Sequence, residues 1–321
     1  MKDGIFVLSI FVINPTAGKS DSTAVIEKEV KSRMDSSQYI IYRTTGRGDA
    51  TRFVREFLSS HTEPVRIFAC GGDGTLNEVV NGAVGCPNAA VGIYPCGSGN
   101  DFVKYYGGKE AFLDFDSLLC ATEHKIDLLK VGDKYSVNVD NFGLDAYVCN
   151  TMIQVKQKPL IGGKNAYYTG VLKGFVKAMH SHCQVKVDGE IINPDNELLL
   201  CTVANCYYVG GAFKCAPRAL NDDGLLEVCL IKPISRLKFI SLLVPYTKGE
   251  HLESPKFKDI MVYRRGKKVE VSAPAGFLNC VDGEIIEENR FTIEVAPRAV
   301  SFLVPAAATL NVPVKEEALK Q

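Results

Sequence analysis

In the first third of the chain, short apolar runs alternate with segments whose apolar residues recur every three to four positions. The apolar runs, which are typical of buried strands, are 6–13, 39–42, 65–69 and 89–94. The segments between them, which predict helices, are 20–34, 49–58 and 75–83. This β-α-β-α alternation predicts an α/β domain: a parallel sheet with helices on both faces, which binds ligands at the carboxyl ends of its strands.

From about residue 126 the pattern changes to short apolar strands that are separated or flanked by turn pairs such as Asp-Gly. The predicted strands are 128–131, 135–139, 184–187, 198–204, 225–231, 268–271 and 291–295. One segment, 166–180, has helical spacing instead. We therefore predict a second domain that is a mainly antiparallel β-sandwich. The domain division that follows is 1–125, 126–305 and a C-terminal tail, 306–321.

Composition and charge narrow the class of protein. Lys and Arg total 37 and Asp and Glu also total 37, so no strong positive field indicates binding to nucleic acid. The 11 cysteines are odd in number and never spaced Cys-x-x-Cys, which favours a reducing cytoplasm. No apolar run approaches the ~20 residues of a transmembrane segment, and we interpret the apolar start as a strand rather than a signal peptide. We expect a cytoplasmic protein, at most peripheral to a membrane.

The most informative segment is 70–82, which joins the third strand to the third helix through three glycines, Gly71, Gly72 and Gly74. A glycine turn that leads into a helix presents backbone N–H groups at the positive end of the helix, and such a site binds phosphate. Asp73 lies inside this turn. Its carboxylate would repel phosphate unless a cation or a hydroxyl lay between the two groups.

Two further loops follow the first and fourth predicted strands, at 14–20 and 95–102. Neither the P-loop nor the dinucleotide motif fits, because Ile13 and Asn77 stand where those motifs need glycine. Each loop by itself is compatible with an ordinary turn. All three loops, however, lie at the same ends of parallel strands, where one ligand could contact all of them.

This combination resembles the diacylglycerol kinase catalytic domain, in the bacterial lipid kinase family that also includes sphingosine and ceramide kinases. The matching motifs are Asn14-Pro15-x-x-Gly18-Lys19, Gly71 to Glu78, Gly97 to Phe102, Asn138-Val139, Gly143-x-Asp145-Ala146, Asn205, Gly210-Gly211, Ala216-Pro217, Asp223-Gly224 and Asp282-Gly283-Glu284. They occur in consistent order along nearly the whole chain. Ser98 replaces the threonine that is common in the family, and Arg218-Ala219-Leu220 departs from the segment that contributes to a second, structural Mg²⁺ site in some members.

The resemblance implies ATP as phosphoryl donor, Mg²⁺ as cofactor and a lipid hydroxyl as acceptor, with diacylglycerol giving phosphatidic acid as the leading case. The residues that it assigns to the nucleotide are Asn14, Pro15, Thr16, Ala17, Gly18, Thr44, Gly72, Asp73, Gly74, Thr75, Leu76, Asn77, Glu78 and Ser98. It assigns Asp73 and Asp223 to metal binding. The acceptor would come from a membrane surface, and the sequence does not decide between a monomer and a homodimer.

The catalytic acids require a choice, because Val-Asp-Gly-Glu occurs twice, at 187–190 and 281–284. The first copy lies between two strand-like runs and predicts a hairpin turn. In the second copy, Asp282 and Glu284 are two positions apart and would share one face of a strand. The resemblance favours Glu284 or Asp282 as the proton acceptor, whereas in the sphingosine-directed branch of the family the acid of the glycine loop, here Asp73, has that role. The sequence does not separate these candidates.

Two other functions remain open at this point, namely an NAD kinase-like phosphotransferase and a nucleotide-binding protein without catalysis. Two surfaces are candidates for membrane contact: the basic cluster 264–268 and the helical segment 164–180. The structural alternatives are a solvent-exposed turn for 264–268 and a helix packed on the β domain for 164–180. His180, His182, Cys183 and Cys201 match no zinc-binding spacing.

Overall fold

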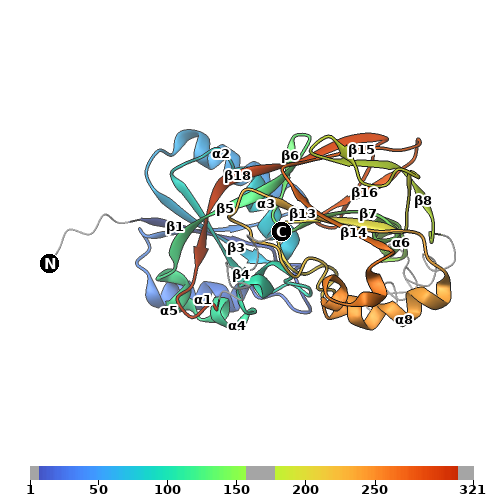
Figure 1. Cartoon of the computed structure of the whole chain (residues 1–321). Helices are drawn as coiled ribbons and strands as arrows, with labels where there is room; N and C mark the ends of the chain where they lie inside the picture. The colour runs from blue at the N-terminus through green and yellow to red at the C-terminus, as the bar shows by residue number, and fades with distance from the viewer. Residues whose placement is uncertain (1–6, 157–177, 310–321) are drawn as a thin grey trace. The chain divides into compact units, whose positions relative to one another are not determined.

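The computed structural model of the chain describes residues 7–156 and 178–309 (Figure 1). The contacts divide it into two compact units. The first contains the described residues up to Leu128 together with those from Pro297 onward, and the second contains the described residues from Leu129 to Ala296. Most of the helix that we predicted at 166–180 and most of the tail at 306–321 lie outside the described residues.

The first unit is built on a parallel sheet. Its strands are β1 (Leu8–Ile13), β2 (Tyr39–Arg43), β3 (Val65–Gly71), β4 (Ala89–Pro95) and the end of β18 (Arg290–Val304). The spatial order is β18-β4-β3-β1-β2, and every neighbouring pair in it is parallel. β5 (Thr122–Val131) also pairs with β18. The predicted parallel sheet is thus confirmed.

Three helices connect these strands, and shorter ones follow β4. The bounds are α1 (Thr23–Arg33), α2 (Asp49–Ser60), α3 (Asp73–Ala83), η1 (Phe102–Tyr106), α4 (Glu110–Leu113) and α5 (Phe115–Leu119). α2 and α3 pack together on one face, and α1 lies on the other face with α5 (Figure 1). Right-handed β-α-β crossovers place the helices in this way, because the strand order reverses direction after β2.

The core of the first unit explains why its strands are continuously apolar. Ile67, Phe68 and Ala69 of β3 are fully buried, although consecutive side chains point to opposite faces of the sheet. The Phe68 ring stacks on Phe11 of β1, with ring centroids 5.1 Å apart. Helices on both faces therefore bury both sides of each central strand.

The second unit is an antiparallel sandwich, as predicted. One sheet has the order β14 (Met261–Gly266), β13 (Leu226–Ile231), β12 (Leu200–Ala204), β7 (Val139–Gly143), β16 (Leu278–Val281) and β17 (Glu284–Glu287). The facing strands are β10 (Glu190–Ile191), β9 (Gln184–Val187), β15 (Lys268–Ser272) and the first part of β18. Smaller pairings involve β6 (Lys134–Ser136), β8 (Ser181–His182) and β11 (Glu197–Leu198). Side chains of both sheets form one buried cluster.

Two helices of the second unit were missing from the prediction, α6 (Leu144–Lys156) and α8 (Arg236–Thr247). α8 contains Pro245, a residue that usually ends a helix, and its apolar residues lie on nearly every side. It therefore lacks the helical period of apolar residues on which the prediction depended. The short helices η2 (Glu250–Leu252) and η3 (Pro255–Phe257) follow it.

The last strand, β18, belongs to both units. Its first residues pair with β15 in the second unit, and Ser301 and Phe302 pair with β4 in the first. The chain therefore returns to complete the parallel sheet after building the sandwich. A linear division at residues 126 and 305 does not represent this return.

Candidate active site

Four loops meet at the carboxyl ends of the parallel strands in the first unit. The backbone N–H of Asn14 donates to the carbonyl of Cys70 at 2.9 Å, and the N–H of Cys96 donates to the carbonyl of Gly71 at 2.9 Å. Thr44, which follows β2, donates its N–H to Ile13 at 2.9 Å. The three predicted glycine and polar loops therefore lie side by side, with Thr44 beside the first of them.

Glycines let these loops approach each other backbone to backbone. A Cβ atom added to Gly97 would lie 2.4 Å from the Cα of Gly72. A Cβ on Gly18 would lie 2.2 Å from the carbonyl oxygen of Cys96, and Gly18 has a φ of +78°. No other residue type fits either position without moving a loop.

Asn14 and Thr75 tie the first loop to the second. The Asn14 amide Nδ2 donates to Thr75 Oγ1 at 3.1 Å, while Asn14 Oδ1 accepts from the backbone N–H and the hydroxyl of Thr16. Leu76 is fully buried and its N–H donates to Gly72, so its side chain belongs to the core. The exposed residues of the predicted nucleotide set in these loops are Thr16, Gly18, Gly74 and Ser98, whereas Pro15, Ala17, Gly72 and Asn77 are half-buried.

Asp73 and Asp101 face each other across Gly99. A Cβ on Gly99 would lie 3.2 Å from Asp73 Oδ2 and 3.8 Å from Asp101 Oδ2. Burial raises the pKa of Asp73, the negative charge of Asp101 raises it further, and a hydrogen bond from the Phe102 N–H to Asp73 Oδ1, at 3.0 Å, opposes the shift. Two converging carboxylates fit a divalent cation with a preference for oxygen, since the cation removes their mutual repulsion.

Sequence reasoning did not select Asp101 as a metal ligand. The sequence feature that could have indicated Asp101 is its position next to Asn100, in the loop that follows β4. Asn100 has a φ of 49°, and this bend turns the chain so that Asp101 is directed back towards Asp73. Asp101 also forms an ion pair with Lys104, with 2.5 Å between Nζ and Oδ1.

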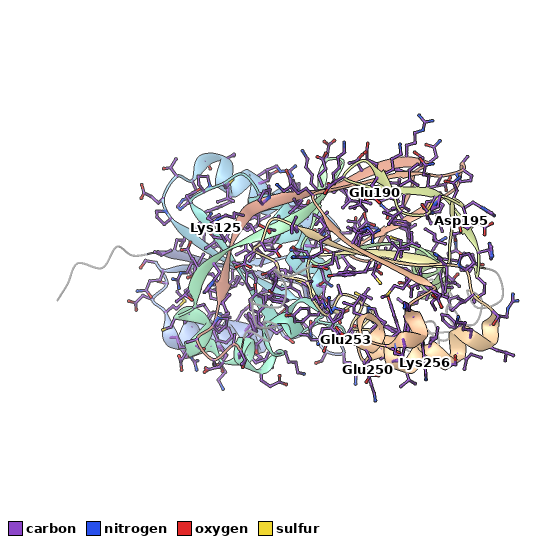
Figure 2. All side chains as sticks on the ribbon, in the orientation of Figure 1. Lys125, Glu190, Asp195, Glu250, Glu253 and Lys256 are labelled. Atoms are coloured by element: carbon purple, nitrogen blue, oxygen red, sulfur yellow. The ribbon has the colours of Figure 1, made fainter. Side chains whose placement is uncertain are left out.

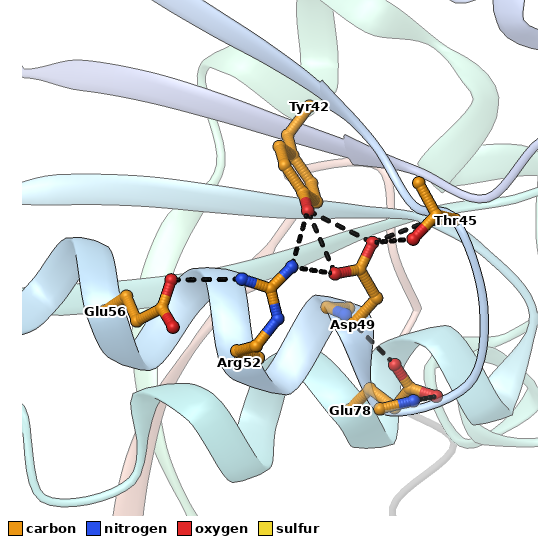
Figure 3. A network of polar contacts seen from close by, with 8 residues as sticks. Tyr42, Thr45, Asp49, Arg52, Glu56 and Glu78 are labelled. Carbon is orange, nitrogen blue, oxygen red and sulfur yellow. Dashed lines mark hydrogen bonds and ion pairs between the residues drawn. The ribbon is translucent and has the colours of Figure 1, made fainter.

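Glu78 has a structural partner in the first turn of α2 (Figure 3). Its two carboxylate oxygens accept hydrogen bonds from the backbone N–H groups of Gly48 at 2.9 Å and Ala50 at 3.2 Å. Glu78 therefore caps the positive end of α2. Gly48 before α2 and Gly72 before α3 both supply no side-chain cap, so the contact with Glu78 is what distinguishes the N-terminus of α2.

Asp49 completes the same network (Figure 3). Its carboxylate accepts from the backbone N–H of Thr45 at 2.8 Å, from the Tyr42 hydroxyl and from Arg52. Hydrogen bonds from Thr45, in the first place from its backbone N–H, lower the pKa of Asp49 to about 2. The N-terminus of α2 is thus occupied by Glu78, while Asp49 connects Thr45, Tyr42 and Arg52 beside it.

In the second unit, Asp282 and Gly283 form a two-residue hairpin turn between β16 and β17. Their φ angles of 44° and 85° are those of a type I′ turn. Asp282 accepts backbone N–H groups from Val137 at 2.8 Å and Val139 at 3.0 Å. The expectation that Asp282 and Glu284 share a strand face was wrong, because Asp282 lies in the turn and only Glu284 lies on a strand.

Glu284 begins β17 and remains accessible. Its Oε2 lies 3.2 Å from the Lys134 ammonium, and the side chains of Glu284 and Lys134 are 32% and 53% exposed. Such an exposed ion pair contributes little to stability. Asp282, by contrast, is held by two backbone hydrogen bonds.

The first copy of Val-Asp-Gly-Glu forms the predicted hairpin between β9 and β10. Asp188 and Gly189 have φ angles of 49° and 87°. The Asp188 carboxylate accepts from the backbone N–H groups of Lys267 and Lys268, at 3.0 and 2.9 Å. The aspartates of the two copies thus make the same kind of contact.

Asp223 forms an ion pair with Arg265, which also binds Glu227. The Asp223 Oδ1 accepts from the N–H of Leu225 at 3.1 Å. Burial raises the pKa of Glu227 to about 7, although Arg265 lowers it. Asp223 and Asp73 lie in different units, and the assignment of Asp223 to a metal stays a prediction.

A different group of metal-ligating side chains comes together on the ladder formed by β8 and β11. His180, His182 and Glu197 offer ligand atoms that lie within 4.8 Å of one another, and in the described part of the chain no other group of three or more meets this distance. Spacing along the sequence could not reveal it, because Glu197 reaches the histidines only by strand pairing opposite His182. All three side chains are substantially exposed to solvent.

Comparison with known proteins connects both units to one family. The family model of the diacylglycerol kinase catalytic domain matches residues 9–131, and that of the YegS C-terminal NAD kinase beta sandwich-like domain matches residues 138–304. A "Probable lipid kinase YegS-like" of Chromohalobacter salexigens is 30% identical over 305 residues, which cover 91% of this chain and 93% of that protein. A diacylglycerol kinase of Bacillus subtilis is 27% identical over 85% of this chain and 88% of its own length.

A solved structure supports the fold. The crystal structure of a diacylglycerol kinase from Bacillus anthracis str. Sterne superposes with a TM-score of 0.69 at 18% identity, and covers 95% of this chain and 99% of that one. The sequence matches define the class of protein as a kinase that transfers a phosphoryl group to an alcohol. The chain belongs to the lipid kinase family that joins a diacylglycerol kinase catalytic domain to a YegS C-terminal domain. Within the described ranges, no helix is long and apolar enough to cross a bilayer.

Proposed function

We propose that this chain is an ATP-dependent lipid kinase that transfers the γ-phosphoryl group of ATP to the hydroxyl of diacylglycerol, giving phosphatidic acid. The observation that carries the proposal is the close packing of the loops at 14–18, 71–75 and 96–101, in the unit that matches the diacylglycerol kinase catalytic domain. The names of the relatives support the choice of a lipid hydroxyl as acceptor.

The start of α3 is the proposed position of the ATP phosphates. Gly72 provides no side-chain cap for this helix, and an added Cβ at Gly74 would meet no atom within 4 Å. Uncapped N–H groups at a helix N-terminus favour phosphate binding, and the space beside Gly74 leaves room for a ligand. The capped N-terminus of α2 lacks this property, so we infer that the role of Glu78 is to fix α2 rather than to contact the nucleotide.

Asp73 and Asp101 are the proposed ligands of Mg²⁺. When bound, Mg²⁺ would neutralise charge on the phosphates of the donor. Asp73 is kept close to this position by the N–H of Phe102, and burial, followed by the negative charge of Asp101, raises the pKa of its carboxyl. Asp73 and Glu284 remain the two candidates for the proton acceptor, and we assign Asp282 to holding the segment 137–139.

The direct test supplies radiolabelled ATP and Mg²⁺ to the purified chain with mixed micelles of diacylglycerol, ceramide or sphingosine, and separately with NAD. Labelled phosphatidic acid is expected, and it should disappear in Asp73→Asn but persist in the matched exposed-acid variant Asp116→Asn. Label on another lipid would overturn the choice of diacylglycerol. Label on NAD alone, or ATP binding without transfer to any acceptor, would overturn the lipid kinase assignment.

A further inference from the structure

Helix α8 of the second unit presents an apolar stripe to solvent. Leu237, Ile240 and Val244 are 82%, 58% and 61% exposed. Their spacing of three and four residues puts them on one side of the helix. The other large apolar side chains exposed in the described ranges, Val25 and Ile191, lie singly on α1 and β10.

The opposite side of α8 is firmly packed, so the exposure of the stripe is fixed by the fold. Leu242 and Tyr246 are buried, and with Phe239 and Leu243 they line a small apolar cavity against residues of β12 and β13. The Ser235 hydroxyl accepts the N–H of Lys238 and caps the helix. α8 is thus anchored through one face and leaves the other in contact with water.

The charged residues within α8, Arg236 and Lys238, have one sign, whereas Lys248 after the helix lies 4.0 Å from Glu250. Between residues 232 and 248 the chain has four basic residues, Lys232, Arg236, Lys238 and Lys248, and no acidic one. Acidic residues return only after the helix, where Glu250 and Glu253 lie with Lys256 (Figure 2). The N-terminal half of α8, around Leu237, is therefore apolar and positively charged.

We propose that α8 docks on the surface of an anionic phospholipid bilayer, with Leu237, Ile240 and Val244 inserted at the boundary between headgroups and acyl chains. An apolar stripe flanked by Lys and Arg is the pattern of helices that lie in a membrane interface. A second copy of the chain is a poorer occupant, because a symmetric contact through α8 would bring the basic residues of both copies together. The choice of a membrane as the partner rests on the proposed function, in which the acceptor is a lipid. The exposure of the stripe is independent of that proposal.

The basic cluster at 264–268, which the sequence offered as a membrane surface, contains four basic residues, and two of them have acidic partners. Arg265 forms ion pairs with Asp223 and Glu227, and Lys268 pairs with Glu270 and Glu294. Charges already paired within the fold attract lipid headgroups weakly. α8 is the stronger candidate among the described residues, because it presents exposed large apolar side chains and 264–268 does not.

The test is co-sedimentation of the full chain with vesicles, without ATP, at matched salt. Vesicles of phosphatidylcholine with phosphatidylglycerol should bind the wild type, and pure phosphatidylcholine should bind it much more weakly. The double variant Leu237→Glu/Ile240→Glu should lose at least about tenfold in partitioning, since it puts two charges where apolar groups enter the interface. Ile191→Glu, at a 43% exposed apolar position of the same unit, is the control and should bind as the wild type does.

Unchanged binding of Leu237→Glu/Ile240→Glu, with a wild-type melting curve, would overturn the inference. So would a concentration-dependent dimer that this variant abolishes while the wild type ignores vesicles. A milder pair, Arg236→Gln/Lys238→Gln, should lose the preference for anionic vesicles and keep the fold. Because the assay contains no ATP, α8-dependent binding without lipid phosphorylation would reject the proposed function and leave the docking surface standing.

Discussion

Gly97→Ala tests the loop packing that carries the functional proposal. The added Cβ would lie 2.4 Å from the Cα of Gly72 and 3.0 Å from its nitrogen. Carbon atoms in good contact are about 3.5 Å apart, so the two loops must separate by about 1 Å. Overpacking of this kind costs about 1–3 kcal/mol, which lowers the Tm of a domain of this size by roughly 3–10 °C.

The effect on catalysis should be larger than the effect on stability. A displacement of about 1 Å among positioning groups can reduce a rate about 100-fold, because phosphoryl transfer depends chiefly on alignment. We therefore expect Gly97→Ala to weaken ATP binding, measured by calorimetry, and to reduce kcat/KM for lipid phosphorylation about 100-fold while most of the protein stays folded.

Gly82→Ala provides the matched control. Its Cβ would lie 2.7 Å from the Val54 Cβ and 2.9 Å from the Thr51 carbonyl oxygen, which is comparable overpacking between α2 and α3. It should lower the Tm to a similar degree and leave the ATP affinity of the folded protein unchanged. If Gly97→Ala keeps wild-type affinity and turnover, the contact between the loops has no part in nucleotide binding.

Three acids give further predictions. The raised pKa of Asp73 means that ionisation of this carboxyl destabilises the fold as pH rises above 3.8, so Asp73→Asn should match or exceed the wild-type Tm at pH 7, while turnover falls at least about 100-fold. The Tm difference should vanish below pH 3.8; a lower Tm for the variant at pH 7 would contradict the argument. Glu284→Gln should change stability by less than about 1 kcal/mol, because its ion pair is exposed, and wild-type turnover in this variant would remove Glu284 from catalysis. Asp49 has a lowered pKa, so it stabilises the fold above pH 3.8 and loses this contribution as pH falls through about 2. Asp49→Asn should therefore lower the Tm at pH 7 and approach the wild type in acid; a pH-independent difference would count against it.

The parallel sheet and the glycine loops could be predicted because their causes are local. Strands buried on both faces have to be apolar throughout, as Ile67 to Ala69 are, and the glycines that permit close approach stand directly after the strands. The antiparallel domain was equally readable from its Asp-Gly turns, such as Asp188-Gly189.

The features that escaped prediction depend on distant parts of the chain. The return of β18 to the first unit is decided by pairing between Ser301 and Ala90, which no local pattern encodes. Asp101 approaches Asp73 directly after Asn100, which adopts a positive φ, a conformation that the sequence permits but does not require. Glu197 meets His182 through strand pairing, and α8 is hidden by Pro245 and by its all-round apolar composition.

The duplicated Val-Asp-Gly-Glu motif allows the role of its aspartate to be isolated. Asp188 and Asp282 occupy equivalent type I′ turns and each accepts two backbone N–H groups, so the contacts of Asp282 need no catalytic explanation. Replacing either by Asn removes a charged acceptor and should cost about 1–3 kcal/mol. If Asp282 is structural, Asp188→Asn and Asp282→Asn will lose stability alike, and the folded fraction of each will retain most of its turnover. A selective loss of turnover in Asp282→Asn at equal stability would return Asp282 to the catalytic set, beside Glu284 and Asp73.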